Sequence, residues 1–170
     1  NNINLVYIPT IKSKNYSTLL HSFLSTIHAC LFKKYDFILY VNTANGPFGL
    51  LTKLFRIKTA INTDGLEWER PKWRGIASKY FYFSSFLSTK LFNVIISDSI
   101  EMKKIYKQKF NVNSTFIPYG GNIRYSNNSS LIHQFNVNRF EYYLIVGRLI
   151  PDNNSDYIIN EYIKSNSNKK

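Results

Sequence analysis

The stretch that decides the fold runs Lys58-Thr59-Ala60-Ile61-Asn62-Thr63-Asp64-Gly65-Leu66-Glu67-Trp68. Its first four residues are typical of a strand, and an acid, a glycine and a tryptophan follow shortly after them. Polar, glycine-hinged loops at the carboxyl ends of strands are where open α/β sheets bind ligands. A carboxylate can accept hydrogen bonds from sugar hydroxyls, and an indole can cover the apolar face of a sugar ring. The alternative is a plain Asp-Gly turn before a helix.

Strand-like and helix-like patterns alternate on both sides of this loop. We expect strands over residues 3–8, 36–41, 59–62, 93–97 and 114–117. We expect helices over 16–34 and 76–92, a helix from the turn at Asn45-Gly46-Pro47 to about residue 55, and one capped by Asp98 or Ser99 that ends near 110. This alternation predicts an α/β fold with a parallel sheet covered on both faces. Right-handed crossovers would bring loops 42–47, 62–73 and 97–99 to one sheet edge.

The character of the chain changes after Gly121. Residues 121–139 are polar and rich in Asn and Ser, as in a linker. A further strand is expected over 142–146, then a loop at Gly147-Arg148, then a helix from about Asn154. The piece from Glu141 onward is about 30 residues long and too small to fold alone.

Composition limits the class of protein. The 170 residues are 44% hydrophobic, which is enough for one domain with a sizeable core. The net charge of +12 favours anionic partners, although a general bias toward Lys, Asn and Ile is an alternative cause. The single cysteine, Cys30, allows no intrachain disulfide, so we expect an intracellular protein. No apolar run approaches the roughly 18 residues that a membrane span requires.

Six segments carry a resemblance to a known family. They are Asn62–Arg74, Tyr7–Lys14, Tyr40–Phe48, Ile95–Ser99, Phe116–Gly121 and Val146–Pro151. Together they resemble the rhamnosyltransferase-type enzymes of glycosyltransferase family 4, which build bacterial capsules, exopolysaccharides and O-antigens, and the resemblance extends over nearly the whole chain. Several of the segments are short, and it is their ordered conjunction that makes the resemblance specific.

The resemblance implies part of a GT-B fold, in which two Rossmann-like domains face each other across the active site. Residues 1–120 would be the acceptor-side domain without its first strand and glycine-rich loop, 121–140 the hinge, and 141–170 the start of the nucleotide-sugar domain. The missing first strand would precede Asn1, and the remaining donor domain, with its paired glutamates, would follow Lys170. Catalysis by these residues alone is therefore not expected.

The implied activity is a metal-independent, retaining transfer of a rhamnosyl group from dTDP-rhamnose to a polyprenyl-diphosphate-linked glycan. No cofactor and no metal are expected beyond the nucleotide-sugar donor. Protein cations and helix termini would take the place of a metal ion. The implied location is the cytoplasm, at the inner face of the plasma membrane.

The resemblance also implies roles for individual residues. Asp64 would be the catalytic residue, facing the acceptor hydroxyl or the transferred sugar. The acceptor would contact Asn45, Gly46, Gly65, Glu67 and Trp68. The donor would contact Tyr119, Gly120 and Gly121 at the hinge and Gly147 and Arg148 in the second domain. The chain departs from the family where Pro151-Asp152-Asn153-Asn154 stands in place of a lysine-containing motif.

Two features leave alternatives open. Lysines flank the aromatic run Tyr80–Phe83 and recur between Lys103 and Lys109, which predicts a surface that rests on anionic lipid. A solvated charged face over a buried aromatic stripe would have the same pattern. A basic nucleic-acid-binding module is the second reading of the whole chain, but no recognised binding motif supports it and no nucleic-acid partner is expected. A non-catalytic remnant is the third.

Overall fold

A computed structural model describes residues 3–13, 16–32, 35–126, 128, 130–150 and 153–169. The chain divides into two compact units, Asn1–Tyr119 and Gly120–Lys170. The expected helix end at residues 33–34 and the motif residues Lys14, Pro151 and Asp152 lie outside the described residues.

The first unit contains a parallel sheet of four strands in the order β1-β2-β3-β4. The strands are β1 (Phe37–Tyr40), β2 (Lys58–Thr63), β3 (Val94–Ser97) and β4 (Thr115–Phe116). The predicted α/β class and parallel sheet are therefore confirmed, and each of these strands falls within a residue or two of its expected bounds.

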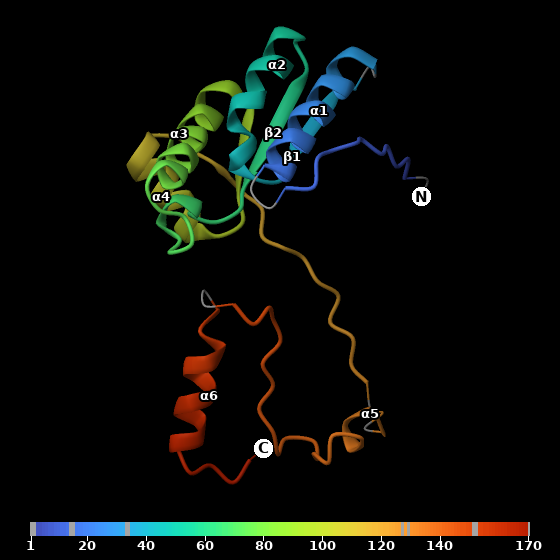
Figure 1. The fold of residues 1–170 in the computed structure, drawn as a ribbon, viewed down its shortest axis with the longest axis vertical. Coiled ribbons are helices and arrows are strands. Elements are labelled where there is room, and N and C mark those ends of the chain that lie inside the picture. Colours follow the sequence, from blue (N-terminus) through green and yellow to red (C-terminus); the bar gives the residue numbers. More distant parts are fainter. Residues whose placement is uncertain are drawn as a thin grey trace. The chain divides into compact units, whose positions relative to one another are not determined.

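Helices alternate with the strands, as Figure 1 shows for the upper part of the chain. They are α1 (Ser17–Phe32), α2 (Gly49–Leu54), α3 (Ile76–Leu91) and α4 (Ile100–Phe110). Ser99 caps α4 by accepting a hydrogen bond from the Met102 amide at 3.2 Å. Two short 3₁₀ helices, η1 (Thr43–Phe48) and η2 (Glu67–Glu69), occupy the loops after β1 and β2.

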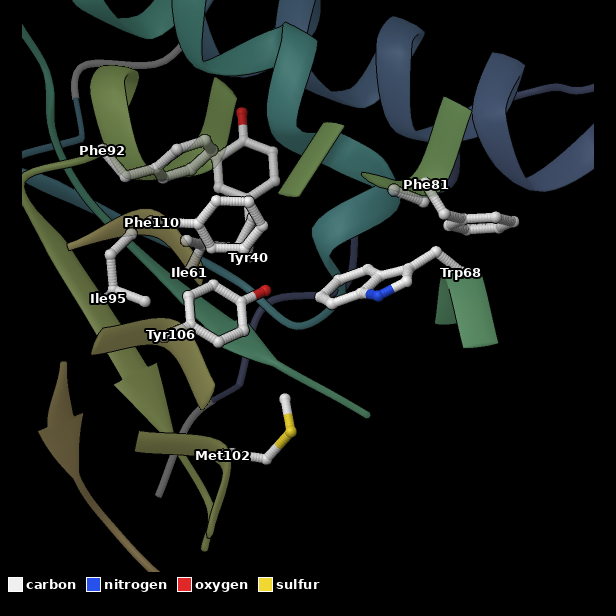
Figure 2. Close-up of a cluster of buried hydrophobic side chains, with 10 residues drawn as sticks. Tyr40, Ile61, Trp68, Phe81, Phe92, Ile95, Met102, Tyr106 and Phe110 are labelled. Atoms are coloured by element: carbon white, nitrogen blue, oxygen red, sulfur yellow. The ribbon is translucent and has the colours of Figure 1, made fainter. Parts of the chain in front are cut away.

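The hydrophobic core lies on one face of the sheet. Tyr40, Ile61 and Ile95 point from three neighbouring strands into a cluster of aromatic side chains contributed by η2, α3 and α4 (Figure 2). Side chains of the opposite face, such as Phe37 and Leu39, are exposed. The prediction of a sheet covered on both faces is therefore wrong for the described residues. Right-handed crossovers that always step toward the next strand place the connecting helices α2, α3 and α4 on the same face.

Two predicted strands are absent from the described residues. Residues 3–8 and 142–146 have no ladder partner, and most of their apolar side chains are exposed. An apolar run has the composition of a strand, but it becomes one only where a neighbouring strand accepts its backbone hydrogen bonds. The turn expected at Asn45-Gly46-Pro47 is a full 3₁₀ helix, and α2 follows it from Gly49.

The second unit contains two helices among its described residues, α5 (Ser130–His133) and α6 (Ser155–Lys164). α6 begins where a helix was expected, whereas the short α5 interrupts the segment expected to be a linker. The rings of Tyr143 and Tyr162 pack edge to face with centroids 5.4 Å apart.

Candidate functional site

The loop after β2 presents Asp64 at the carboxyl edge of the sheet. Thr63, the last residue of β2, is fully buried and donates a hydrogen bond to the Ile96 carbonyl of β3 at 3.0 Å. Gly65 follows with φ of 77°, a conformation that glycine adopts without strain. Asp64 between them is exposed, and its carboxylate has no hydrogen bond or ion pair within the part of the chain that the structure describes. A rigid strand end thus holds an unpaired carboxylate in solvent.

Glu67, three residues on, is the opposite case. Its side chain is only 8% exposed and accepts hydrogen bonds from Arg70 Nη1 at 2.7 Å and Trp73 Nε1 at 2.6 Å. Lys72 Nζ lies 3.6 Å from the second carboxylate oxygen. Burial alone would raise the pKa of Glu67, but the hydrogen bonds from Arg70 and Trp73 and the positive charges of Lys72 and Arg70 outweigh it and hold the pKa below its ordinary value. Glu67 therefore ties its own loop together.

The two tryptophans of this loop are structural anchors. The Trp68 ring is buried and packs edge to face with Tyr82 and Phe110 at centroid distances of 5.7 and 6.0 Å. Its ring also lies 6.4 Å, centroid to centroid, from that of Tyr106 (Figure 2). The Trp73 ring packs on that of Phe81 with the ring centroids 4.9 Å apart. Because the core covers the Trp68 ring, this geometry leaves no open ring face for a sugar, and its predicted contact with an acceptor stays a prediction.

The loop after β1 is the second part of the candidate site. Asn42 caps η1 by accepting a hydrogen bond from the Ala44 amide at 2.7 Å. Asn45 is buried, and its side-chain carbonyl oxygen has no hydrogen-bond partner among the described residues. Gly46 lies so close to α3 that a Cβ atom there would overlap with the Ser84 carbonyl and lie 2.7 Å from Ser88 Oγ. Gly46 thus allows η1 and α3 to pack closely.

Polar side chains of α3 hold both loops in place. Ser78 Oγ donates to the Trp68 carbonyl at 2.7 Å, which fixes η2. Tyr80 OH donates to the Ala44 carbonyl at 2.7 Å and Ser84 Oγ to the Thr43 carbonyl at 2.5 Å, which fixes η1. Sequence reasoning missed these residues, although small serines among large aromatics at helical spacing are a signal of close helix contact.

Tyr119, a predicted donor-binding residue that belongs to the first unit, contacts the carboxyl edge of the sheet. Its hydroxyl accepts a hydrogen bond from Asn62 Nδ2 at 3.1 Å, and Asn62 lies two residues before Asp64 in the chain. The Asn62 side-chain carbonyl oxygen is buried and has no partner among the described residues. The last residue of the first unit is thus attached to the carboxyl end of β2.

The remaining predicted donor residues belong to the second unit. A Cβ atom added at Gly120 or Gly121 would meet no other atom within 4 Å, so close packing requires neither glycine. Gly147 and Arg148 lie before α6, and the Arg148 carbonyl accepts a hydrogen bond from Asn153 Nδ2 at 2.6 Å. Nothing in the first unit's geometry places them at Asp64, and their donor-binding roles stay predictions.

Two further features are absent from the described residues. They contain no group of three or more His, Cys, Asp or Glu side chains that could hold a metal ion. Likewise, within the described ranges no helix combines the length and the apolar character needed to cross a bilayer.

The parallel sheet, its crossover helices and the polar loops at the carboxyl edge define a Rossmann-like α/β domain. A family model described as a domain of unknown function, DUF1972, matches residues 19–122, which is more than half of the chain, and the chain belongs to this family. The domain is found in glycosyltransferase-associated proteins, where it is like the N-terminal domain of glycosyltransferase family 4. A search of curated proteins found no match.

Proposed function

We propose that this chain is the acceptor-side part of a glycosyltransferase that moves a rhamnosyl group from dTDP-rhamnose to a polyprenyl-diphosphate-linked glycan. The observation that carries the proposal is the Asp64 carboxylate, which has no partner among the described residues and lies at the carboxyl edge of a Rossmann-like sheet. This edge is where open α/β sheets bind their ligands. Membership of a family found in glycosyltransferase-associated proteins supports the same reaction class.

The contrast between the two acids of the loop supports a chemical role for Asp64. Both carboxylate oxygens of Glu67 already accept hydrogen bonds, from Arg70 and Trp73, so Glu67 has little capacity left to bind a ligand. Asp64 can still accept hydrogen bonds from a ligand, because no described residue donates one to its carboxylate. In the proposed reaction its carboxylate accepts the proton of the attacking acceptor hydroxyl or orients that hydroxyl toward the sugar. The side-chain carbonyl oxygens of Asn45 and Asn62, which are buried and have no partner within the described ranges, are further acceptors at the same edge.

Donor binding involves the second unit in this proposal. The Arg148 guanidinium would neutralise the departing nucleotide diphosphate, for which arginine is well suited because its planar group binds phosphate oxygens in pairs. Tyr119, Gly120 and Gly121 would form the hinge between the two domains. The reaction needs no metal if these cationic groups stabilise the leaving group.

The test uses the protein as the source cell makes it, carrying an affinity tag on the chromosomal copy of the gene. Purified protein is incubated with labelled dTDP-rhamnose and a polyprenyl-diphosphate-linked acceptor, and label in the lipid fraction is measured. Asp64→Asn should lower the transfer rate at least about 100-fold, the lower limit for a general acid or base. The other dTDP-sugars serve as competing donors and define the specificity.

Asp36→Asn is the matched control. Asp36 is also exposed, but it precedes β1 and so lies at the opposite, amino edge of the same sheet. It should leave transfer unchanged. Full activity in Asp64→Asn, or equal losses in both variants, would refute the assignment of Asp64. Absence of transfer with every nucleotide sugar in the unsubstituted protein would refute the proposed reaction.

A further inference from the structure

The outer face of α3 exposes a row of apolar and basic side chains. Ile76, Lys79, Phe83, Phe86 and Lys90 follow one another at spacings of three or four residues, and all are exposed. Phe83 is 54% exposed and Phe86 39%. The opposite face of the same helix buries Phe81, Ser84, Ser85 and Ser88. The helix thus buries three serines and exposes two of its phenylalanines, which is the reverse of what burial alone would favour for these five residues.

A basic pocket lies where this row ends. Its volume is about 200 Å³, and four cationic residues line it: Lys53, Arg56, Lys58 and Lys90. Its other lining residues are Ile57, Leu91, Phe92 and Asn93, so no acid faces it. Lys90 belongs to both features, because its ammonium lies 5.5 Å from the Phe86 ring centroid. The apolar row and the basic pocket are therefore one continuous surface.

Helix-end electrostatics explains part of this surface. Lys53 and Lys90 lie in the last turns of α2 and α3, where cations stabilise the helix, and Lys53 donates a hydrogen bond to the Lys90 carbonyl at 3.4 Å. It does not explain Lys58, which begins β2, or Arg56, which adopts a left-handed φ of 56°. It also does not explain two exposed phenylalanines beside them.

We propose that this face binds the surface of an anionic phospholipid membrane. Phe83 and Phe86 would enter the boundary between headgroups and acyl chains, and the four cations of the pocket would bind headgroup phosphates. The charge of the surface is complementary to such a membrane, and a helix with apolar and lysine side chains on its outer face is suited to lie in the plane of the interface. A phosphate group fits a cationic pocket of this size, and the exposed phenylalanines beside it supply the apolar contact that a membrane interface accepts.

The direction of α3 gives the binding a consequence. α3 begins just after η2, at the edge that carries Asp64, and ends beside Asn93, which accepts a hydrogen bond from the Thr59 amide near the start of β2. A membrane along α3 would therefore extend past the edge of the sheet at which the proposed lipid-linked acceptor reacts. The membrane contact goes beyond the proposed transfer and does not depend on it.

The experiment is vesicle flotation of the full chain. One set of vesicles contains phosphatidylcholine alone and the other phosphatidylcholine with phosphatidylglycerol. Binding should require the anionic lipid. Phe83→Ser/Phe86→Ser should lower the partition coefficient at least about tenfold, and Lys53→Gln/Lys90→Gln by about 25-fold, at about fivefold for each lysine near the surface. Circular dichroism verifies that the variants fold.

Lys103→Gln/Lys107→Gln is the matched control. It removes the same charge from α4, where the exposed lysines accompany no exposed row of phenylalanines. We expect less than about a threefold loss. Equal losses in the two lysine pairs, or binding that ignores the phenylalanines, would overturn the proposal in favour of nonspecific attraction by net charge.

Two further arms distinguish other ligands. Binding of inorganic phosphate that is as tight as vesicle binding and unaffected by Phe83→Ser/Phe86→Ser would overturn the proposal in favour of a soluble anion. A labelled single-stranded oligonucleotide that displaces the chain from vesicles and needs the same two phenylalanines would overturn it in favour of nucleic acid. Neither result depends on glycosyl transfer, so the proposed function can fail or hold separately.

Discussion

Glu67→Gln is the most informative single change for the loop that carries Asp64. The carboxylate of Glu67 is 8% exposed and accepts two short hydrogen bonds, from a guanidinium and from an indole N–H. A glutamine of the same shape keeps one acceptor oxygen and turns an NH₂ group toward the other donor. The substitution therefore removes one charge-assisted hydrogen bond, and the glutamine NH₂ group faces the N–H group of Arg70 or of Trp73.

The magnitude follows from these contacts. A hydrogen bond to a charged group contributes about 1.5–3 kcal/mol. Arg70 is 30% exposed and keeps some access to water, which places the loss in the lower part of that range. Lys72 is 41% exposed, and we assign its interaction no energy because solvent screens it. We expect a loss of about 2 kcal/mol, which at about 4 °C per kcal/mol for a domain of this size lowers the Tm by roughly 8 °C.

Intrinsic fluorescence is the appropriate assay. The chain has two tryptophans, Trp68 and Trp73, and both belong to this loop. Thermal unfolding monitored by their emission therefore reports on the loop directly. The control is Glu101→Gln, which removes an exposed ion pair with Lys104 on α4 and should change stability by less than about 1 kcal/mol.

The same variant should change the pH dependence of stability. The folded-state pKa of Glu67 is below its ordinary value of 4.5, so the stability that ionised Glu67 contributes is fully present above about pH 4.5 and is lost as pH falls through the lowered pKa. The difference in stability between the unsubstituted protein and Glu67→Gln should therefore be constant near neutrality and shrink below pH 4.5. Equal Tm values at pH 7, or a difference that grows in acid, would refute this account of the loop.

Three further changes test the packing around the site. Gly46→Ala should destabilise the first unit by about 2 kcal/mol or more, since its methyl group would overlap with the Ser84 carbonyl, whereas Gly121→Ala, with no atom within 4 Å, should leave the urea midpoint unchanged. Gly65→Ala should cost about 1 kcal/mol, because φ of 77° is unfavourable for alanine; an unchanged midpoint would contradict the left-handed loop conformation. Burial raises the pKa of Tyr106 to about 12, although the nearby hydroxyls of Ser85 and Thr43 lower it. Neither of these hydroxyls is in hydrogen-bond geometry with that of Tyr106, so Tyr106→Phe should change stability by less than about 0.5 kcal/mol; a loss above about 2 kcal/mol would show a hydrogen bond to one of them.

The sheet could be predicted from the sequence because its interior strands are short apolar runs with clear boundaries. Ile61 and Ile95 sit in such runs, and Ser99 supplies a cap at the helix that follows β3. The strands expected over 3–8 and 142–146 have the same composition, so composition could not separate them from real strands. What separates them is a partner for the backbone, which is a property of the whole sheet. Helices cover only one face of the sheet because of the strand order, and the periodicity of apolar residues in the sequence does not reveal that order.

The place of the β2 loop at the carboxyl edge of the sheet could be predicted from the sequence, but the burial and hydrogen bonds of its individual residues could not. The loop at the end of β2 was expected to be the ligand site, and Asp64 lies there in solvent. Glu67 and Trp68 were grouped with it, because sequence alone cannot distinguish an exposed acid from a buried one. The burial of Glu67 depends on Arg70 and Trp73, which turn back toward it only when η2 forms.

The two acids of this loop show how a small domain can hold an exposed carboxylate in a fixed position. A carboxylate in solvent is free to act on a ligand but does nothing to order the backbone that carries it. A buried carboxylate orders the backbone, but its oxygens already accept hydrogen bonds from the protein and cannot bind a ligand. Here Glu67 closes the loop through Arg70 and Trp73, the Trp68 ring anchors it in the core, and Ser78 holds the Trp68 carbonyl. Asp64 therefore needs no partner of its own to be held in place, and its lone pairs remain available to a substrate.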